Sequence, residues 1–159
     1  MAATANSRAG SLFRGSALAR LDAKGRLTLP RFVRDTMQAR SGIRSVVLAR
    51  HRTKPCLIGG ADESEFLGQF SRAEVPSTRE ADGPYPPPGG FGAAQSIPWS
   101  PGGRIVLPQW LRELAGMEDS ILFVGTGKVF EMWDTAAAAN SSEDSLRQLA
   151  ARHLRRQPP

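Results

Sequence analysis

The sequence has very few of the residues that build disulfides and zinc sites. Among 159 residues it contains one cysteine, Cys56, and two histidines, His51 and His153. A single cysteine excludes an internal disulfide, and this small set cannot supply the Cys/His ligands of a structural zinc site. We therefore expect neither a metal nor any other cofactor.

Long apolar runs are also missing. No stretch approaches the roughly 18 apolar residues needed to span a bilayer, and residues 1–10 lack the apolar segment of a signal peptide. The hydrophobic content of 40% is nevertheless enough for a modest core in one or two small domains. These features predict a cytoplasmic protein that does not contact membranes.

Catalytic patterns are absent as well. The sequence shows no nucleophile elbow, no carboxylate pair that would flank a cleft, and no glycine-rich phosphate loop of the Walker or dinucleotide type. His51 and Cys56 lie close together in the sequence, but Cys56 falls in a short apolar segment and is expected in the core. We predict no enzymatic activity and no small-molecule substrate.

Positive charge is present and unevenly distributed. Residues 1–55 contain 12 Lys/Arg and only two acids, a net charge of +10, whereas the remaining residues contain 9 Lys/Arg and 13 acids, a net charge of −4. A field concentrated in one half of a chain attracts polyanions, of which nucleic acid is the commonest. The first half is therefore the expected binding half.

The motif LDAKGRLTLPRFVR, residues 21–34, predicts a strand, a tight turn, a second strand and a helix. Asp22 can accept hydrogen bonds from amides of the turn, and Gly25 can adopt the positive φ that ends it. The turn would project Lys24 and Arg26. Pro30 suits the first position of a helix, because its missing N–H would be unpaired there anyway.

A second copy of this pattern, WSPGGRIVLPQWLR, occupies residues 99–112. Each copy is followed by an apolar strand, SVVLA at 45–49 and SILFV at 120–124. An internal duplication explains both observations and predicts two halves related by a pseudo-twofold axis around one core. The second turn has Ser100 in place of an aspartate and no counterpart of Lys24.

These patterns predict how the chain is organised. A strand is expected at 12–18, a short strand from Cys56, and a helix from Asp62 to Phe70. The expected divisions are a disordered extension at 1–11, a first repeat at 12–74, a Pro/Gly-rich linker at 75–91, a second repeat at 92–140, and an amphipathic C-terminal helix and tail at 141–159.

With both copies laid out, the chain resembles the MraZ family. The resemblance is carried by Phe13-Arg14-Gly15, by LDAKGRLTLP at 21–30, by GRIVLPQWLRELAGM at 103–117 and by VGTGKVFEMWD at 124–134. It implies an α+β, mainly β fold, in which two AbrB-like, swapped-hairpin repeats form one barrel-like domain with short helices.

The resemblance also implies a sequence-specific repressor of transcription that binds short G-rich direct repeats of double-stranded DNA upstream of the division and cell-wall gene cluster. The family assembles into ring-like homo-oligomers, so we expect self-association and a location in the cytoplasm at the nucleoid. By position, the candidate DNA-binding residues are Arg14, Asp22, Lys24, Gly25, Arg26, Arg31, Arg34 and Arg104.

Chemistry supports Arg26 as the first candidate for a base contact, because arginine presents a two-pronged donor to guanine in the major groove. Lys24 suits a phosphate, and for Arg104 a purely structural role is an equal alternative. Two other functions stay open: a protein-interaction module of the antitoxin type, and nonspecific binding of nucleic acid. RNA binding is disfavoured, because the basic half lacks aromatic side chains for base stacking.

Overall fold

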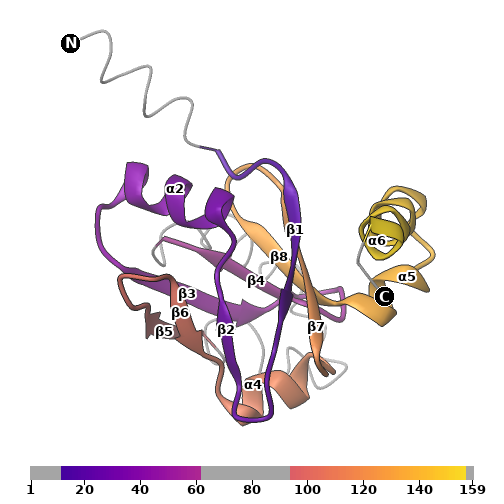
Figure 1. Cartoon of the computed structure of the whole chain (residues 1–159), viewed down its shortest axis with the longest axis horizontal. Helices are drawn as coiled ribbons and strands as arrows, with labels where there is room; N and C mark the ends of the chain where they lie inside the picture. Colours follow the sequence, from indigo (N-terminus) through magenta and orange to yellow (C-terminus); the bar gives the residue numbers. More distant parts are fainter. Residues whose placement is uncertain (1–11, 62–93, 157–159) are drawn as a thin grey trace, which may run out of the picture.

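The computed structural model describes residues 12–61 and 94–156, and its two halves contain the same elements in the same order (Figure 1). The first half contains β1 (Ser16–Arg20), β2 (Arg26–Thr28), α2 (Arg31–Arg40), β3 (Ser45–Arg50) and β4 (Leu57–Gly60). The second contains β5 (Gln95–Pro98), β6 (Arg104–Val106), α4 (Gln109–Leu114), β7 (Ser120–Gly125) and β8 (Phe130–Asp134). Two helices follow, α5 (Thr135–Ala139) and α6 (Asp144–Arg156).

Three predicted features lie outside the described residues. They are the disordered extension at 1–11, the helix from Asp62 and the linker at 75–91. Among the described residues, no helix is long and apolar enough to cross a membrane.

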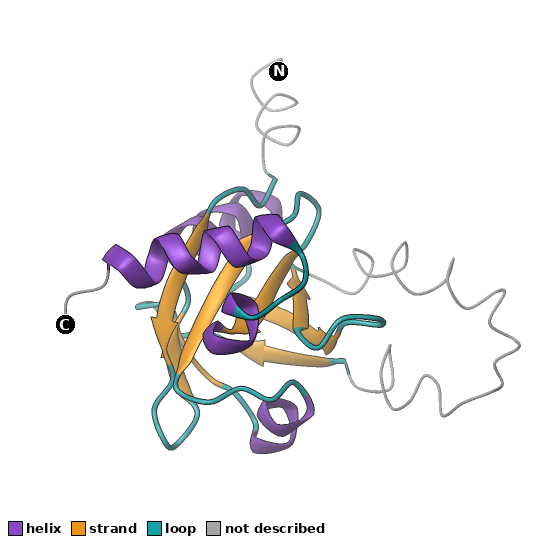
Figure 2. Ribbon diagram, turned by 90° about the vertical axis from the view of Figure 1, so that its right-hand side faces the viewer, coloured by secondary structure: helices purple, strands orange, loops and turns teal. Residues whose placement is uncertain are grey.

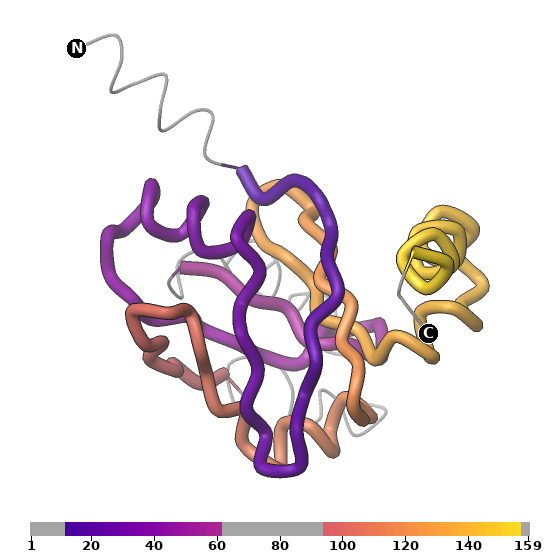
Figure 3. Tube along the Cα trace, in the orientation of Figure 1, coloured from indigo at the N-terminus to yellow at the C-terminus, as the bar shows by residue number. Residues whose placement is uncertain are grey.

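The strands form a six-stranded antiparallel sheet, β1-β7-β8-β4-β3-β5, and a separate two-stranded ribbon, β2-β6. If each strand is replaced by its counterpart in the other half, the six-stranded sheet has the same order read from its opposite edge. β1 pairs with β7 of the other half, and β5 pairs with β3, so each half donates its first strand to the other (Figure 3). A mainly β fold with short helices is confirmed, but the two sheets do not close into one barrel in the described part of the chain.

The main core lies between the six-stranded sheet, the ribbon and α2. Ribbon residues Leu27 and Ile105 are opposite each other and buried, and Val33 and Met37 of α2 pack into the same cluster. Burial of each such side chain contributes about 1.5–3 kcal/mol. Because Leu27 and Ile105 face inward, their neighbours on the ribbon must face outward.

The first strand begins later than expected. The sequence predicted a strand at 12–18, but β1 starts at Ser16. Gly15 has a φ of 112°, which interrupts an extended conformation before it. Phe13 instead makes an isolated bridge to Gly127, with its N–H donating to the Gly127 carbonyl at 2.8 Å.

The C-terminal helices cover the other face of the sheet (Figure 2). Leu146 and Ala150 of α6 pack with Cys56, Leu122 and Trp133, which confirms the predicted amphipathic helix. Leu154 was also predicted to lie on the apolar face of this helix, but this residue is 41% exposed.

Sequence reasoning did not predict α5. Its alanine-rich sequence has a high helix propensity, and the Asp134 carboxylate accepts a hydrogen bond from the Ala137 N–H at the start of the helix.

Candidate nucleic-acid interface

The turn between β1 and β2 is ordered by the Asp22 side chain. One carboxylate oxygen, Oδ1, accepts hydrogen bonds from the backbone N–H groups of Lys24 and Arg26, each at 2.9 Å. The N–H of Gly25 donates to the Asp22 carbonyl at 3.0 Å, and Gly25 has a φ of 85°. The predicted turn chemistry is confirmed, and it fixes the backbone on either side of Lys24.

The same carboxylate holds the Arg26 side chain. Arg26 Nε donates to Asp22 Oδ2 at 2.7 Å, while the side chains of Arg26 and Asp22 remain 50% and 44% exposed. The hydrogen bond from the Arg26 backbone lowers the pKa of Asp22, and the Arg26 side chain lowers it further. The carboxylate therefore stays ionised at neutral pH. The two terminal nitrogens of Arg26 make no hydrogen bond or ion pair with the described residues.

The second turn repeats this geometry without the charge. Ser100 Oγ accepts from the Arg104 N–H at 3.1 Å, as Asp22 does in the first turn, and Gly103 has a φ of 84°. The Gly103 N–H donates to the Ser100 carbonyl at 2.8 Å. A serine hydroxyl can replace the turn-forming hydrogen bond of an aspartate, but it provides no ionic partner for Arg104.

Each turn is braced by an arginine of the other half. Leu107 donates its N–H to the Gly25 carbonyl at 2.7 Å, and Arg112 Nε donates to the Leu107 carbonyl at 3.2 Å. The Arg112 guanidinium lies so close to Gly25 that a side chain there would meet it.

The second turn is braced in the same way by Arg34 of the first half. Arg34 Nε donates to the Leu29 carbonyl at 3.1 Å, and the Arg34 side chain lies against Gly103. Arg34 and Arg112 therefore connect the two halves.

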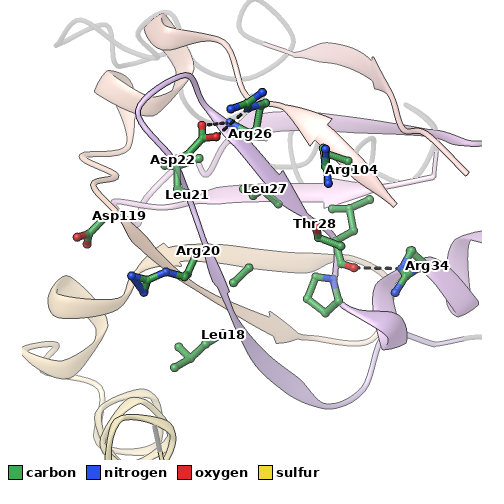
Figure 4. A pocket seen from close by; sticks show the side chains of 13 residues that line it. Leu18, Arg20, Leu21, Asp22, Arg26, Leu27, Thr28, Arg34, Arg104 and Asp119 are labelled. Atoms are coloured by element: carbon green, nitrogen blue, oxygen red, sulfur yellow. Dashed lines mark hydrogen bonds and ion pairs between the residues drawn. The ribbon is translucent and has the colours of Figure 1, made fainter. Parts of the chain in front are cut away.

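A groove of about 850 Å³ runs between β1 and β2 beside the first turn (Figure 4). Four arginines line it, namely Arg20, Arg26, Arg34 and Arg104, together with Asp22 and Asp119. Arg26 and Arg104 both belong to the outward face of the ribbon and lie diagonally across its two strands. The structure therefore brings together cations from both repeats.

The predicted site residues fall into two groups. Asp22, Lys24, Gly25, Arg26, Arg34 and Arg104 all lie in or against the two turns. Arg14 and Arg31 are exposed but do not line the groove, and Arg14 lies before the opposite end of β1.

Sequence reasoning missed two residues of this region, Arg20 and Arg112. The equivalent positions of Arg34 and Arg112 in the two copies were a signal that could have revealed Arg112.

A second polar cluster lies under α6, away from the groove residues. Trp133 Nε1 donates to Glu131 Oε1 at 2.8 Å, and Lys54 Nζ lies 3.6 Å from Glu131 Oε2. His51 Nδ1 accepts from two backbone amides of the β3–β4 hairpin. Cys56 is fully buried, as predicted, and burial raises the pKa of its thiol far above the usual range, so the thiol is no nucleophile.

Comparison with known proteins shows the family to which this chain belongs. A family model described as "MraZ protein, putative antitoxin-like" matches residues 91–157. A protein of Nitratidesulfovibrio vulgaris named "Transcriptional regulator MraZ" is 33% identical over 145 residues, which cover 87% of this chain and 94% of the relative. The chain belongs to the MraZ family. A protein of the same name from Saccharophagus degradans is 31% identical over 79% of this chain and 84% of its own length. Another, from Gluconacetobacter diazotrophicus, is 31% identical over 88% of this chain and 91% of its own length.

The resemblance predicted from the repeated turn motifs is thereby confirmed. MraZ proteins are regulators rather than enzymes, in agreement with the prediction made from the missing catalytic patterns. The relative from Nitratidesulfovibrio vulgaris covers 87% of the chain, whereas the family model covers only residues 91–157, in the second half.

Proposed function

We propose that this MraZ-family chain is a sequence-specific regulator of transcription that binds double-stranded DNA through its first turn and the β2-β6 ribbon. The observation that carries the proposal is Arg26, held by Asp22 with its terminal nitrogens free beside a groove lined by arginines of both repeats. The regulator names of its relatives agree with this function.

The ribbon suits the major groove of DNA, which accepts a two-stranded β-ribbon. In the proposed complex Arg26 reads guanine with its two terminal nitrogens, and Lys24 contacts a phosphate. Arg104, which has no ionic partner among the described residues, adds a contact on the same face. Asp22 and Gly25 set the shape of the turn and do not contact bases. Arg14 and Arg31 are proposed phosphate contacts outside the groove.

We further propose that the chain represses transcription from short G-rich direct repeats in its own upstream region, ahead of the division and cell-wall genes. Copies assembled into a ring would place several turns on successive repeats, so that weak individual contacts become tight through effective concentration. The exchange of β1 and β5 between halves supports an AbrB-like, swapped-hairpin architecture. The regulator would act in the cytoplasm, at the nucleoid.

Fluorescence anisotropy with two labelled duplexes tests this function. One duplex carries the DNA upstream of the protein's own gene, and the other a scrambled sequence of the same composition. Wild type should prefer the upstream duplex. Loss of one good bidentate base contact costs about 1–3 kcal/mol, so Arg26→Ala should reduce the preference by about 5- to 150-fold.

Arg44→Ala is the matched control, because Arg44 is an exposed arginine of the same half that does not line the groove. It should keep the wild-type preference. If wild type binds both duplexes alike, the basic half is a general polyanion surface and sequence-specific regulation is wrong. If Arg26→Ala keeps the full preference, the first turn is not the reading element.

A further inference from the structure

The C-terminal helix α6 extends beyond the sheet that it covers. Leu146 and Ala150 are buried, but from Arg152 onward only His153 is partly covered. His153 Nε2 lies 2.9 Å from Ser16 Oγ, a hydrogen bond that ties this end of the helix to the start of β1. Leu154 on the same end is exposed. The position of the last turn is thus fixed, although most of its side chains face solvent.

Three arginines on this end, Arg152, Arg155 and Arg156, form what we call the α6 arginine cluster. All three are exposed, and none makes a hydrogen bond or ion pair with the described residues. By contrast, Arg147 at the other end of α6 is bonded to the Asp144 carboxylate and to the Ser141 carbonyl. Cations at a helix C-terminus gain about 0.3–1 kcal/mol each from the helix dipole. The cluster holds charge that nothing in the described structure neutralises.

The α6 arginine cluster lies on the same side of the molecule as the groove. In Figure 1, β1 and β2 are in front and α6 is seen end-on beside them; Figure 2, turned by 90°, shows the C-terminal end of α6 reaching toward that front. Leu18 of β1 lines the groove and also packs against the cluster of side chains under α6. The helix therefore flanks the proposed DNA-binding surface.

We propose that the α6 arginine cluster is a second DNA contact, which binds the phosphate backbone beside the duplex held at the first turn. This inference rests on the proposed function. A duplex seated on the ribbon continues past the groove in both directions, and its phosphates carry a dense negative charge. Arginine pairs with phosphate through two parallel hydrogen bonds, so three free guanidinium groups suit this partner. Such contacts position the duplex without reading its sequence.

The test compares Arg152→Gln/Arg155→Gln/Arg156→Gln with wild type on the upstream and scrambled duplexes over a range of salt. Each lost phosphate contact reduces the slope of log K against log[salt] by about 0.9, so the slope should fall by about 2 to 3. Affinity for both duplexes should fall together, by about tenfold or more at 0.1 M salt, because phosphate contacts are insensitive to sequence. The preference between the duplexes should not change.

Two controls isolate the charge. Arg147→Gln removes an arginine of the same helix and should leave the slope unchanged. Arg152→Lys/Arg155→Lys/Arg156→Lys keeps the charge and should keep most of the slope; circular dichroism checks that α6 remains folded in every variant.

An unchanged salt slope in the triple glutamine variant would overturn the proposal. A loss of preference between duplexes without a change in slope would also overturn it. If wild type shows no preference but the triple variant still lowers the slope, the proposed regulator function fails and the phosphate contact stands.

Discussion

Gly25 is the position at which the structure makes its sharpest energetic prediction. With a φ of 85°, it adopts a backbone conformation that costs an alanine about 1–2 kcal/mol. A Cβ atom built on Gly25 would also lie 2.5 Å from the Leu107 carbonyl oxygen and 3.2 Å from Arg112 Nε. Relief of the backbone clash requires the turn to move away from Leu107, whose N–H donates to the Gly25 carbonyl. Loss of that hydrogen bond adds about 0.5–1.5 kcal/mol.

We therefore expect Gly25→Ala to lower the free energy of unfolding by about 2 kcal/mol, which is the conformational cost plus the lost hydrogen bond, less the gain of about 0.4–1 kcal/mol from a less flexible unfolded chain. Gly42→Ala is the matched control, because Gly42 has a φ of 74° but no atom within 4 Å of the added Cβ. It should lose only the conformational part, about 1 kcal/mol after the gain from a less flexible unfolded chain. Urea unfolding followed by circular dichroism measures both. Equal losses in the two variants would refute the argument that the two halves meet at Gly25.

Two further predictions concern Arg112 and Cys56. Arg112→Ala removes the hydrogen bond to the Leu107 carbonyl that braces the first turn, so it should weaken the preference for the upstream duplex several-fold without changing the salt slope. A changed slope in the same anisotropy titrations would mean that Arg112 contacts phosphate directly. Because burial raises the pKa of the Cys56 thiol, native protein should react with a disulfide reagent at least about 100-fold more slowly than protein in urea. Comparable rates, followed by absorbance, would show that the thiol is accessible.

The first turn could be predicted from the sequence because its chemistry is local. Asp22, Gly25 and the residues between them determine the turn through hydrogen bonds that span at most four positions. The order of elements from β1 to β4 and from β5 to β8 was also predictable, since the apolar patterns repeat in both halves, but α5 was not predicted. The end of α2 before Gly42, which has a positive φ, follows from the same local logic.

The parts that escaped prediction depend on contacts between distant residues. Nothing in the β1 sequence specifies that Leu18 pairs with Leu122 across the molecule. The bracing role of Arg112 arises only when the other half brings Gly25 against it. Likewise, the free end of α6 becomes meaningful only beside the groove, because a cationic helix terminus alone indicates no more than a favourable dipole interaction.

The exchange of first strands has a consequence for how the protein is made. When the first half leaves the ribosome, β1 has no partner, because β7 has not yet been synthesised. Pairing of β5 with β3 also waits for the second half. Cooperative folding therefore has to follow synthesis of nearly the whole chain, and such long-range pairing slows folding. Until then the nascent chain presents unpaired strand edges, so we expect it to depend on ribosome-associated chaperones more than a chain of two self-contained domains would.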